Sequence, residues 1–384
     1  MTAEMLPRER VKKTLAFQEP DRLPTAVGGG PYGIVDEVYF KLLKFYSLGD
    51  PIAPFRQGHN ISYLDDRLLE KLGTDLRYVY PAISPTSPTR STGAPDTFLD
   101  AFGQVWKRAV PYFYAGEGIL AEAASVDQID EIVSWPNTKD PQWFTGVEAR
   151  AQRLRTSTDY WITARMITSH GPFQYASDLR GVEKFMLDMV MDPDFAFALL
   201  NRIGDTLCGL LDSYLLACGK YIDMIELPGD DYAGDKNLII SPAMFRMFIK
   251  PVIVRMVERI RTFRPDIKIM LHSDGVVTKL IPDLLDAGID VVHPLEPLPA
   301  TDQAQVKKEY YGKLAFLGGI DIGESLTGST EGVAVETKRC IQALAPGGGF
   351  ILAPSNHIQA DVPPENVGAL FESARSLGKY PIHI

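Results

Sequence analysis

Short apolar runs of four to six residues, rich in Val, Ile, Leu and aromatic side chains, alternate with longer segments along most of the chain. In the longer segments apolar residues recur every three or four positions, as in amphipathic helices. Eight of the short runs are predicted as strands: residues 22–27, 76–80, 160–165, 222–227, 267–271, 290–293, 314–317 and 349–353. Eight strands alternating with helices predict an α/β fold of the (β/α)8, or TIM, barrel class. A doubly wound open sheet is the alternative, but the Gly-x-Gly-x-x-Gly pattern follows none of these strands.

Proline and serine mark where several of the predicted helices begin. Ser241-Pro242 combines an N-cap residue with proline in the first turn, and Pro251 predicts a kink further along the same helix. Pro193 and Pro363-Pro364 begin two other amphipathic segments. These signals favour helices between the strands rather than further strands.

Residues 81–120 interrupt the alternation. They contain Pro and Ser, followed by alternating apolar and aromatic residues around Gly103. We expect a β-hairpin inserted into the barrel and covering one mouth, with a helix in residues 1–20 closing the opposite end. Residues 1–384 would then form a single barrel domain.

The 384-residue chain has 39 Lys and Arg against 49 Asp and Glu, a net charge of −10. This balance argues against non-specific nucleic-acid binding, which depends on basic residues. The charged N-terminus and the absence of an apolar run of roughly 18 residues predict neither a signal peptide nor a membrane span. We therefore expect a cytoplasmic protein. Its three cysteines are too few for a disulfide framework and are predicted as buried apolar side chains.

Polar residues follow the predicted strands, at the end where barrels of this class carry their active sites. Glu226 ends one strand and precedes Asp230, Asp231 and Tyr232; the other residues at strand ends are His272, Asp274, His293, Asn356 and His357. Three of the six histidines thus lie at strand ends. Each alone could be a hydrogen-bonded structural histidine, but together they predict a functional site.

Other residues are candidates to shape or bind in the same mouth. Arg165 lies near the tip of its strand, where it could bind a carboxylate or pair with Glu226 or Asp230. His59 could face the site or cap the helix that begins near Tyr63. The glycine-rich loop at 28–30 and the aromatic segment 112–114 could line the opening.

Four sequence blocks resemble the uroporphyrinogen decarboxylase superfamily. They are RERVKKTLAFQEPDRLP, ELPGDDYAG followed by ISPAMFRMFIKP, LHSDGVVTKLIPDLLDAGIDVVHPLEP, and GGGFILAPSNHIQADVPPENV. The resemblance covers nearly the whole chain. It implies a single-domain barrel, often dimeric. It also implies either porphyrinogen decarboxylation or zinc-dependent methyl transfer between corrinoid proteins, thiols and methylated substrates.

Departures from the two patterns distinguish these activities. The decarboxylases carry an arginine-rich segment after the first strand, whereas this chain reads LPTAVGGGPYGIVDE there. A substrate with many carboxylates needs cationic partners, so decarboxylation of uroporphyrinogen is not expected. His357 does keep a histidine position of the decarboxylases. The methyltransferases use His-x-Cys and a later Cys as zinc ligands, but here the positions read His272-Ser273-Asp274 and Asn356.

Two alternatives for the site follow from the missing thiols. His272 and Asp274, completed by His357 or Glu226, could bind zinc through nitrogen and carboxylate oxygen. Without metal, Asp274 would orient His272 as an acid or base. We predict a methyltransferase that moves a methyl group from a small methylated substrate to a corrinoid (cobalamin) protein. The alternatives are a porphyrinogen decarboxylase and a catalytically silent barrel that binds a tetrapyrrole.

The roles we predict fall into three groups. The catalytic candidates are His272, His357, Asp274, Glu226 and Asp231. The substrate-binding candidates are Asn356, His293, Arg165, Tyr232 and His59. The candidate metal ligands are His272, Asp274 and His357.

Overall fold

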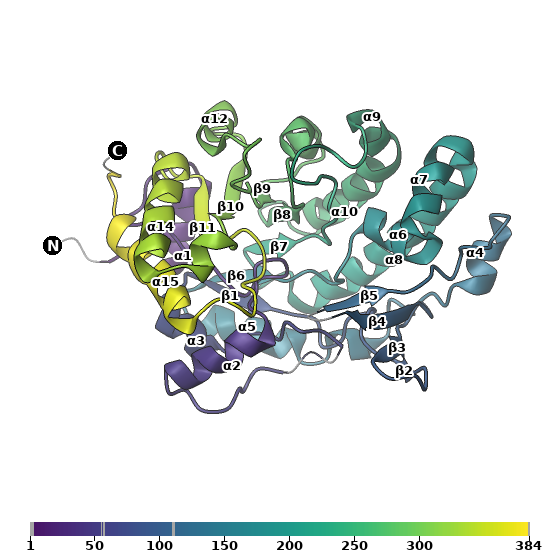
Figure 1. Cartoon of the computed structure of the whole chain (residues 1–384), viewed down its shortest axis with the longest axis horizontal. Helices are drawn as coiled ribbons and strands as arrows, with labels where there is room; N and C mark the ends of the chain where they lie inside the picture. The colour runs from purple at the N-terminus through teal and green to yellow at the C-terminus, as the bar shows by residue number, and fades with distance from the viewer. Residues whose placement is uncertain (1–3, 55, 57, 110–111, 383–384) are drawn as a thin grey trace.

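The computed structural model of the chain describes residues 4–54, 56, 58–109 and 112–382. Its centre is a curled sheet of seven parallel strands in the order β1-β6-β7-β8-β9-β10-β11 (Figure 1). The strands are β1 (Leu76–Val79), β6 (Trp161–Ala164), β7 (Met224–Glu226), β8 (Lys268–His272), β9 (Val291–His293), β10 (Ala315–Ile320) and β11 (Phe350–Pro354). All seven lie where apolar runs predicted them, and the architecture is TIM-barrel-like.

The predicted strand at residues 22–27 does not form a regular strand, and in this respect the prediction is wrong. Thr25 makes an isolated parallel bridge to Leu352 of β11. On its other side, the Thr25 carbonyl accepts a hydrogen bond from the backbone N–H of Asp75, just before β1. Pro24 has no N–H to continue a ladder, and Gly28 turns away with a φ of 104°. The segment therefore contacts both edges of the sheet through single residues.

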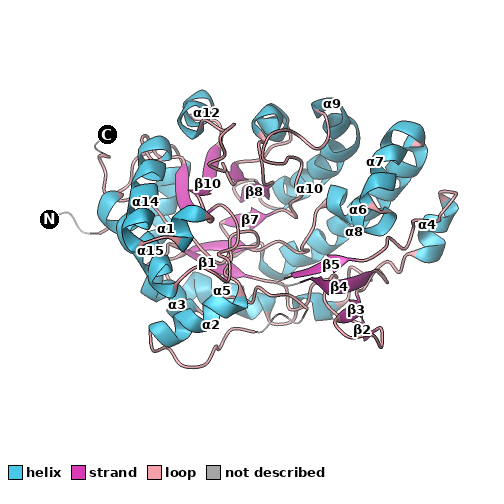
Figure 2. Cartoon of the chain, viewed as in Figure 1, coloured by secondary structure: helices cyan, strands magenta, loops and turns pink. Residues whose placement is uncertain are grey.

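Helices follow most of the strands and cover the outer face of the sheet (Figure 2). They are α1 (Pro7–Leu15), α2 (Asp36–Phe45), α3 (Asp66–Leu72), α4 (Asp127–Ile132), α5 (Val147–Ser157), α6 (Pro172–Arg180), α7 (Val182–Met191), α8 (Pro193–Cys218), α9 (Pro242–Met244), α10 (Lys250–Phe263), α11 (Ile281–Asp286), α12 (Gln303–Glu309), α13 (Glu324–Thr327), α14 (Thr330–Leu344) and α15 (Pro364–Leu377). The predicted starts at Pro193 and Pro364 are confirmed. The Ser241 hydroxyl accepts from the Met244 N–H, so it is the predicted N-cap. A π-helical turn precedes Pro251 (residues Phe245–Ile249), where a kink was predicted.

The inserted segment is a four-stranded antiparallel sheet rather than the single hairpin that we expected. Its strands are β2 (Arg90–Ser91), β3 (Thr97–Leu99), β4 (Val105–Ala109) and β5 (Tyr112–Ala115), paired in chain order. In Figure 1 this sheet lies on the opposite side of the molecule from α1 and α15. The core side chains Phe98 and Trp106 stack within it, which gives the insertion an apolar face of its own.

Helix α1 lies against the N-terminal ends of the parallel strands, as predicted. The Arg8 N–H donates to the carbonyl of Asp159, just before β6, and the Gly349 N–H donates to Thr14. Within the described part of the chain, none of the helices is long and apolar enough to cross a membrane. The three cysteines are buried and form no disulfide, as expected.

Candidate functional site

A cavity of about 610 Å³ opens at the C-terminal ends of the parallel strands. Residues that end or follow β6, β7, β8, β9 and β11 line it, and the inserted sheet contributes aromatic residues including Trp106, Tyr112 and Phe113. Active sites of TIM barrels lie at this end of the strands. The expectation that residues 28–30 and 112–114 help to line the mouth is confirmed for Gly30 and for all three aromatic residues.

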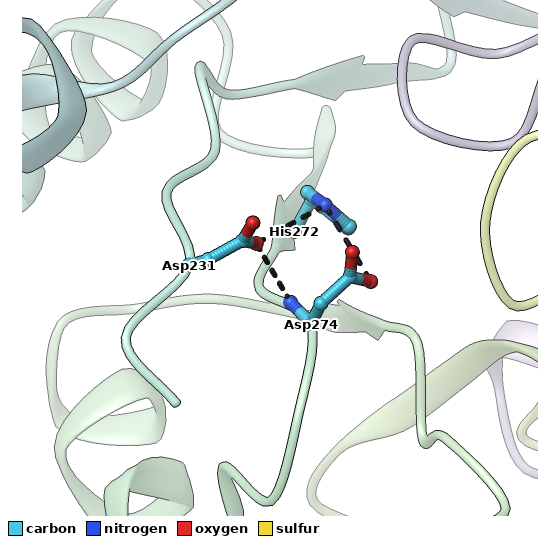
Figure 3. A group of neighbouring side chains, drawn as sticks. All are labelled: Asp231, His272 and Asp274. Carbon is cyan, nitrogen blue, oxygen red and sulfur yellow. Dashed lines mark hydrogen bonds and ion pairs between the residues drawn. The ribbon is translucent and has the colours of Figure 1, made fainter. Parts of the chain in front are cut away.

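Three side chains converge at one wall of this cavity: Asp231, His272 and Asp274 (Figure 3). Asp231 lies in the loop after β7, whereas His272 ends β8 and Asp274 follows two residues later. The Nε2 atom of His272 lies 3.6 Å from an oxygen of Asp231 and 3.8 Å from an oxygen of Asp274. The backbone N–H of Asp274 donates to Asp231 at 3.0 Å, which ties the two loops together.

Hydrogen bonds behind His272 determine which of its nitrogens faces the carboxylates as an acceptor. His293 Nε2 lies 3.2 Å from the carbonyl oxygen of Pro354, and because a carbonyl only accepts, this nitrogen carries the hydrogen. Burial lowers the pKa of His293 well below its ordinary value, so its Nδ1 is an unprotonated acceptor. His272 Nδ1, 2.9 Å away, must then donate to it. In neutral His272 the lone pair therefore lies on Nε2, directed at Asp231 and Asp274.

An acceptor lone pair and two carboxylates in one place repel each other unless a cation or proton lies among them. Burial, together with the negative charges of Asp231 and Glu296, raises the pKa of Asp274 well above its ordinary value. Asn356 donates to one oxygen of Asp274, while the buried Oδ1 atom has no hydrogen-bond partner among the described residues. The donor set of one imidazole and two carboxylates fits Zn²⁺, whose catalytic sites use three protein ligands and leave a position open.

The third member of this group differs from the one that we expected. His357 was predicted as a ligand beside His272 and Asp274, but the group of possible ligands contains Asp231 instead. The Nδ1 atom of His357 accepts a hydrogen bond from the backbone N–H of Gly33 at 3.0 Å. Burial and the nearby Arg165 charge lower the pKa of His357, so its ring is neutral. His357 still lines the cavity, with Nε2 as its hydrogen-bearing atom.

Glu226 lies at the end of β7 and is 1% exposed. Its two oxygens accept from the Tyr32 hydroxyl and from the Gly30 backbone N–H, both at 2.7 Å. Burial raises the pKa of Glu226, against the opposing charge of Arg165. A Cβ at Gly29 would lie 2.1 Å from the Tyr32 ring and 2.5 Å from a Glu226 oxygen, so the loop needs glycine there. The glycine-rich loop thus positions a carboxylate.

The predicted substrate-binding residues do not all reach the cavity. Arg165, His59 and Asn356 line it, and His59 Nε2 contacts the Ser169 hydroxyl at 3.2 Å. Helix α3 is capped by Asp65 rather than by His59. His293 lies buried behind His272, and Tyr232 is buried with its hydroxyl donating to Asp230. Arg165 forms neither of the ion pairs that the sequence suggested; within the described residues its guanidinium stacks over the Tyr63 ring.

The sequence left two cavity features unpredicted. His170 and Asp178 form a second imidazole–carboxylate pair, with 2.7 Å between Nδ1 and the carboxylate oxygen. Burial opposes protonation of His170, but the Asp178 charge outweighs it and raises the pKa. The His170-Gly171-Pro172 turn signals a helix start, from which Asp178 lies nearly two turns along α6. The other feature is Arg56, which comes from the loop before Ile61.

Comparisons with known proteins agree with this architecture. Residues 163–377, more than half of the chain, match the family model described as uroporphyrinogen decarboxylase (URO-D). A chloroplastic uroporphyrinogen decarboxylase of Zea mays is 31% identical over 141 residues, and a uroporphyrinogen decarboxylase of Hordeum vulgare is 30% identical over 141. These matches cover 36% of this chain and 34% and 40% of the relatives, so the chain matches well under half of each.

A solved structure described as a methyltransferase from Methanosarcina mazei has the same fold. It superimposes with a TM-score of 0.68 at 19% identity, covering 97% of this chain and 99% of its own. At this identity the likeness establishes the fold alone. The match to the family model carries the assignment: this chain belongs to the uroporphyrinogen decarboxylase family.

Proposed function

We propose that this protein is a methyltransferase that moves a methyl group from a small methylated substrate to a corrinoid protein. The observation that supports this most is the convergence of His272 Nε2 with the carboxylates of Asp231 and Asp274 at a cavity wall. Breaking a bond between a methyl carbon and a heteroatom requires an acid or a cation at that heteroatom. Asp231, His272 and Asp274 together would hold either a metal cation or an acidic proton.

Asp231, His272 and Asp274 would hold zinc, and bound zinc would supply a Lewis acid that draws electrons from the heteroatom bearing the methyl group. His293 fixes the orientation and tautomer of His272, as the outer partners of metal-binding histidines do. Asn356 positions Asp274. Without metal, a proton held by His272 between the two carboxylates would serve the same heteroatom.

The charges that line the cavity argue against uroporphyrinogen as the substrate. Of the described residues that line the cavity, only Arg56 and Arg165 are permanent cations. A substrate with many carboxylates would leave most of them desolvated without a partner, at a cost of several kcal/mol. We therefore propose that the substrate is smaller and carries far fewer charges.

We propose two protein partners for this reaction. A corrinoid protein would bring its cobalt to the open mouth of the barrel, and the protein itself would act as a homodimer.

The test is a spectroscopic titration of zinc-loaded protein with cob(I)alamin and a panel of methyl ethers and methylamines. We expect the cob(I)alamin spectrum to convert to that of methylcobalamin with at least one donor. The same preparation, given uroporphyrinogen, should release no coproporphyrinogen. Turnover of uroporphyrinogen at about 1 per second or faster would contradict the proposal and favour a decarboxylase. Porphyrin binding without any turnover would favour a silent tetrapyrrole-binding barrel.

A further inference from the structure

Arg165 differs from every other buried arginine that the structure describes. Four arginines are buried: Arg10, Arg77, Arg165 and Arg180. Three of them form ion pairs: Arg10 with Asp75, Arg77 with Asp66, and Arg180 with Asp188. Arg165 is 4% exposed, yet no carboxylate oxygen of the described residues lies within 4.0 Å of its nitrogens. A buried charge without a partner is costly, so its retention calls for an explanation.

A second cation lies beside it. The guanidinium carbons of Arg165 and Arg56 lie 4.9 Å and 5.3 Å from the centre of the same Tyr63 ring, and both side chains line the cavity. Arg56 donates to the Ile61 carbonyl and, within the described part of the chain, has no ion-pair partner either. Burial and the charge of Arg165 lower the pKa of Arg56 to about 10, which reflects two crowded cations. The whole chain has a net charge of −10, so these two unpaired arginines are a local concentration of positive charge in an acidic protein.

The carboxylates that interact electrostatically with the two arginines already accept hydrogen bonds from other groups. Glu226 faces Arg165, but its two oxygens accept from Tyr32 and Gly30. Asp36 faces Arg56, but it accepts from the Ser62 backbone N–H at 2.7 Å. Neither comes within ion-pair distance of the two arginines. Both arginines line the cavity and have no carboxylate partner among the described residues, so their guanidinium groups are available to a ligand.

We propose that Arg56 and Arg165 form an oxyanion-binding subsite that takes a carboxylate group of the substrate. A guanidinium presents paired N–H donors that match the two oxygens of a carboxylate. Arg165 follows β6 and His272 ends β8, with β7 between them. Two inter-strand spacings place these tips about 10 Å apart, so a small acid bound at the arginines would direct its far end toward His272. The inference deepens the proposed function, because it names the methyl donor as a methylated carboxylic acid.

Matched probes test the subsite without requiring methyl transfer. Because aromatic side chains line the cavity, the probes are 4-methoxybenzoate and its uncharged amide, with 4-methoxyphenyl phosphate as the other oxyanion. Trp106 lines the cavity, so its fluorescence reports binding, and calorimetry checks the affinity. We expect the benzoate to bind at least tenfold more tightly than the amide, since a charged hydrogen bond contributes roughly 1.5–3 kcal/mol.

Substitutions then test whether the two arginines cause the preference for the benzoate over the amide. Arg165→Gln and Arg56→Gln should each remove most of the benzoate preference. Arg202→Gln is the matched control, because Arg202 also stacks on an aromatic ring, Trp135, but does not line the cavity; it should keep the preference. If circular dichroism shows that Arg165→Gln does not fold, the Arg56→Gln variant provides the test, because Arg56 is partly exposed.

Equal binding of benzoate and amide, or full preference in both cavity variants, would overturn the subsite. Tighter binding of the phosphate than of the benzoate would overturn its assignment to a carboxylate. These outcomes are separate from those of the proposed function, because no cob(I)alamin is present. A carboxylate preference without methyl transfer would leave the subsite standing and remove the proposed reaction.

Discussion

The two ends of the barrel both bury charged side chains, but they arrange them in opposite ways. At the end closed by α1, opposite charges alternate: Arg10 binds Asp75 at 2.5 Å and Asp21 at 2.7 Å, and Arg22 binds Asp75 at 2.9 Å. Asp75 also accepts from the Thr25 backbone N–H, which attaches the irregular first segment to the sheet. Every charge in this network has a partner, so the network stabilises the fold.

At the open mouth, apart from the His170–Asp178 pair, charges of one sign lie together instead. Asp231, Asp274 and Glu296 crowd one wall, while Arg56 and Arg165 share another. Such an arrangement costs folding free energy unless ligands complete it. The contrast matches the division of labour in TIM barrels, where the N-terminal face contributes stability and the C-terminal face contributes chemistry. Substitutions at the two ends should therefore separate stability from activity.

The largest effect is expected at the mouth, from His272→Ala. If the site holds zinc, this change should abolish metal binding and methyl transfer together. If His272 acts only as an acid, turnover should fall by roughly 10²–10⁴ with the fold intact. Single-turnover kinetics measure the loss of activity, and thermal unfolding shows whether the variant is still folded. Full activity in both His272→Ala and His357→Ala would show that the histidines are structural.

At the closed end, Asp75→Asn should lower stability without touching the chemistry. It leaves Arg10 and Arg22 without their shared carboxylate, and breaking a buried pair costs roughly 3–5 kcal/mol. Urea unfolding measures the loss. The exposed pair Arg259–Asp212 provides the control, since Asp212→Asn should cost less than about 1 kcal/mol. Similar losses in the two variants would contradict the view of this end as a stabilising network.

Gly29→Ala tests how tightly the mouth is packed. The added methyl group would overlap the Tyr32 ring and Glu226, so we expect a loss of about 1–3 kcal/mol. Gly234→Ala is the matched control, because nothing lies within 4 Å of a Cβ there. If Gly29→Ala were as stable as Gly234→Ala, the loop would not be held against Glu226 in solution.

The smallest effect concerns pH at the closed end. Burial disfavours the charge of Asp21, but the Arg10 hydrogen bond outweighs it and lowers the pKa to about 2. A depressed carboxyl pKa contributes stability above its unfolded value, near 3.9, that is lost as pH falls toward 2. The stability difference between wild type and Asp21→Asn should therefore be constant above about pH 5 and shrink on acidification. A difference that grew below pH 4 would have the wrong sign.

The sequence predicted the strands well because buried parallel strands are near-continuous apolar runs. It ended β10 too early, since Gly318 and Gly319 interrupt the apolar pattern but continue the ladder with β11. Strands β2 and β3, of two and three residues, are too short to show alternation, so the insertion was simplified to a hairpin.

The sequence located the three side chains of the possible metal group but not how they pair, and it left His170, Asp178 and Arg56 unpredicted. Strand ends located His272, Asp274 and Asn356, because register aligns the tips of neighbouring strands. That Asp231 rather than His357 completes the group depends on how the β7 loop folds back over β8, which no local pattern specifies. The unpaired state of Arg165 is likewise a tertiary property.

The most direct test of the contrast between the two ends is the zinc content of purified protein after incubation with zinc and desalting. We expect about one zinc per chain in the wild type and in Asp75→Asn, and none in His272→Ala or Asp274→Asn. Elemental analysis gives the stoichiometry, and calorimetry gives the affinity. A wild-type protein that retains no zinc would contradict the metal site and leave only the acid role of His272. A His272→Ala variant that retains zinc fully would contradict the assignment of the ligands.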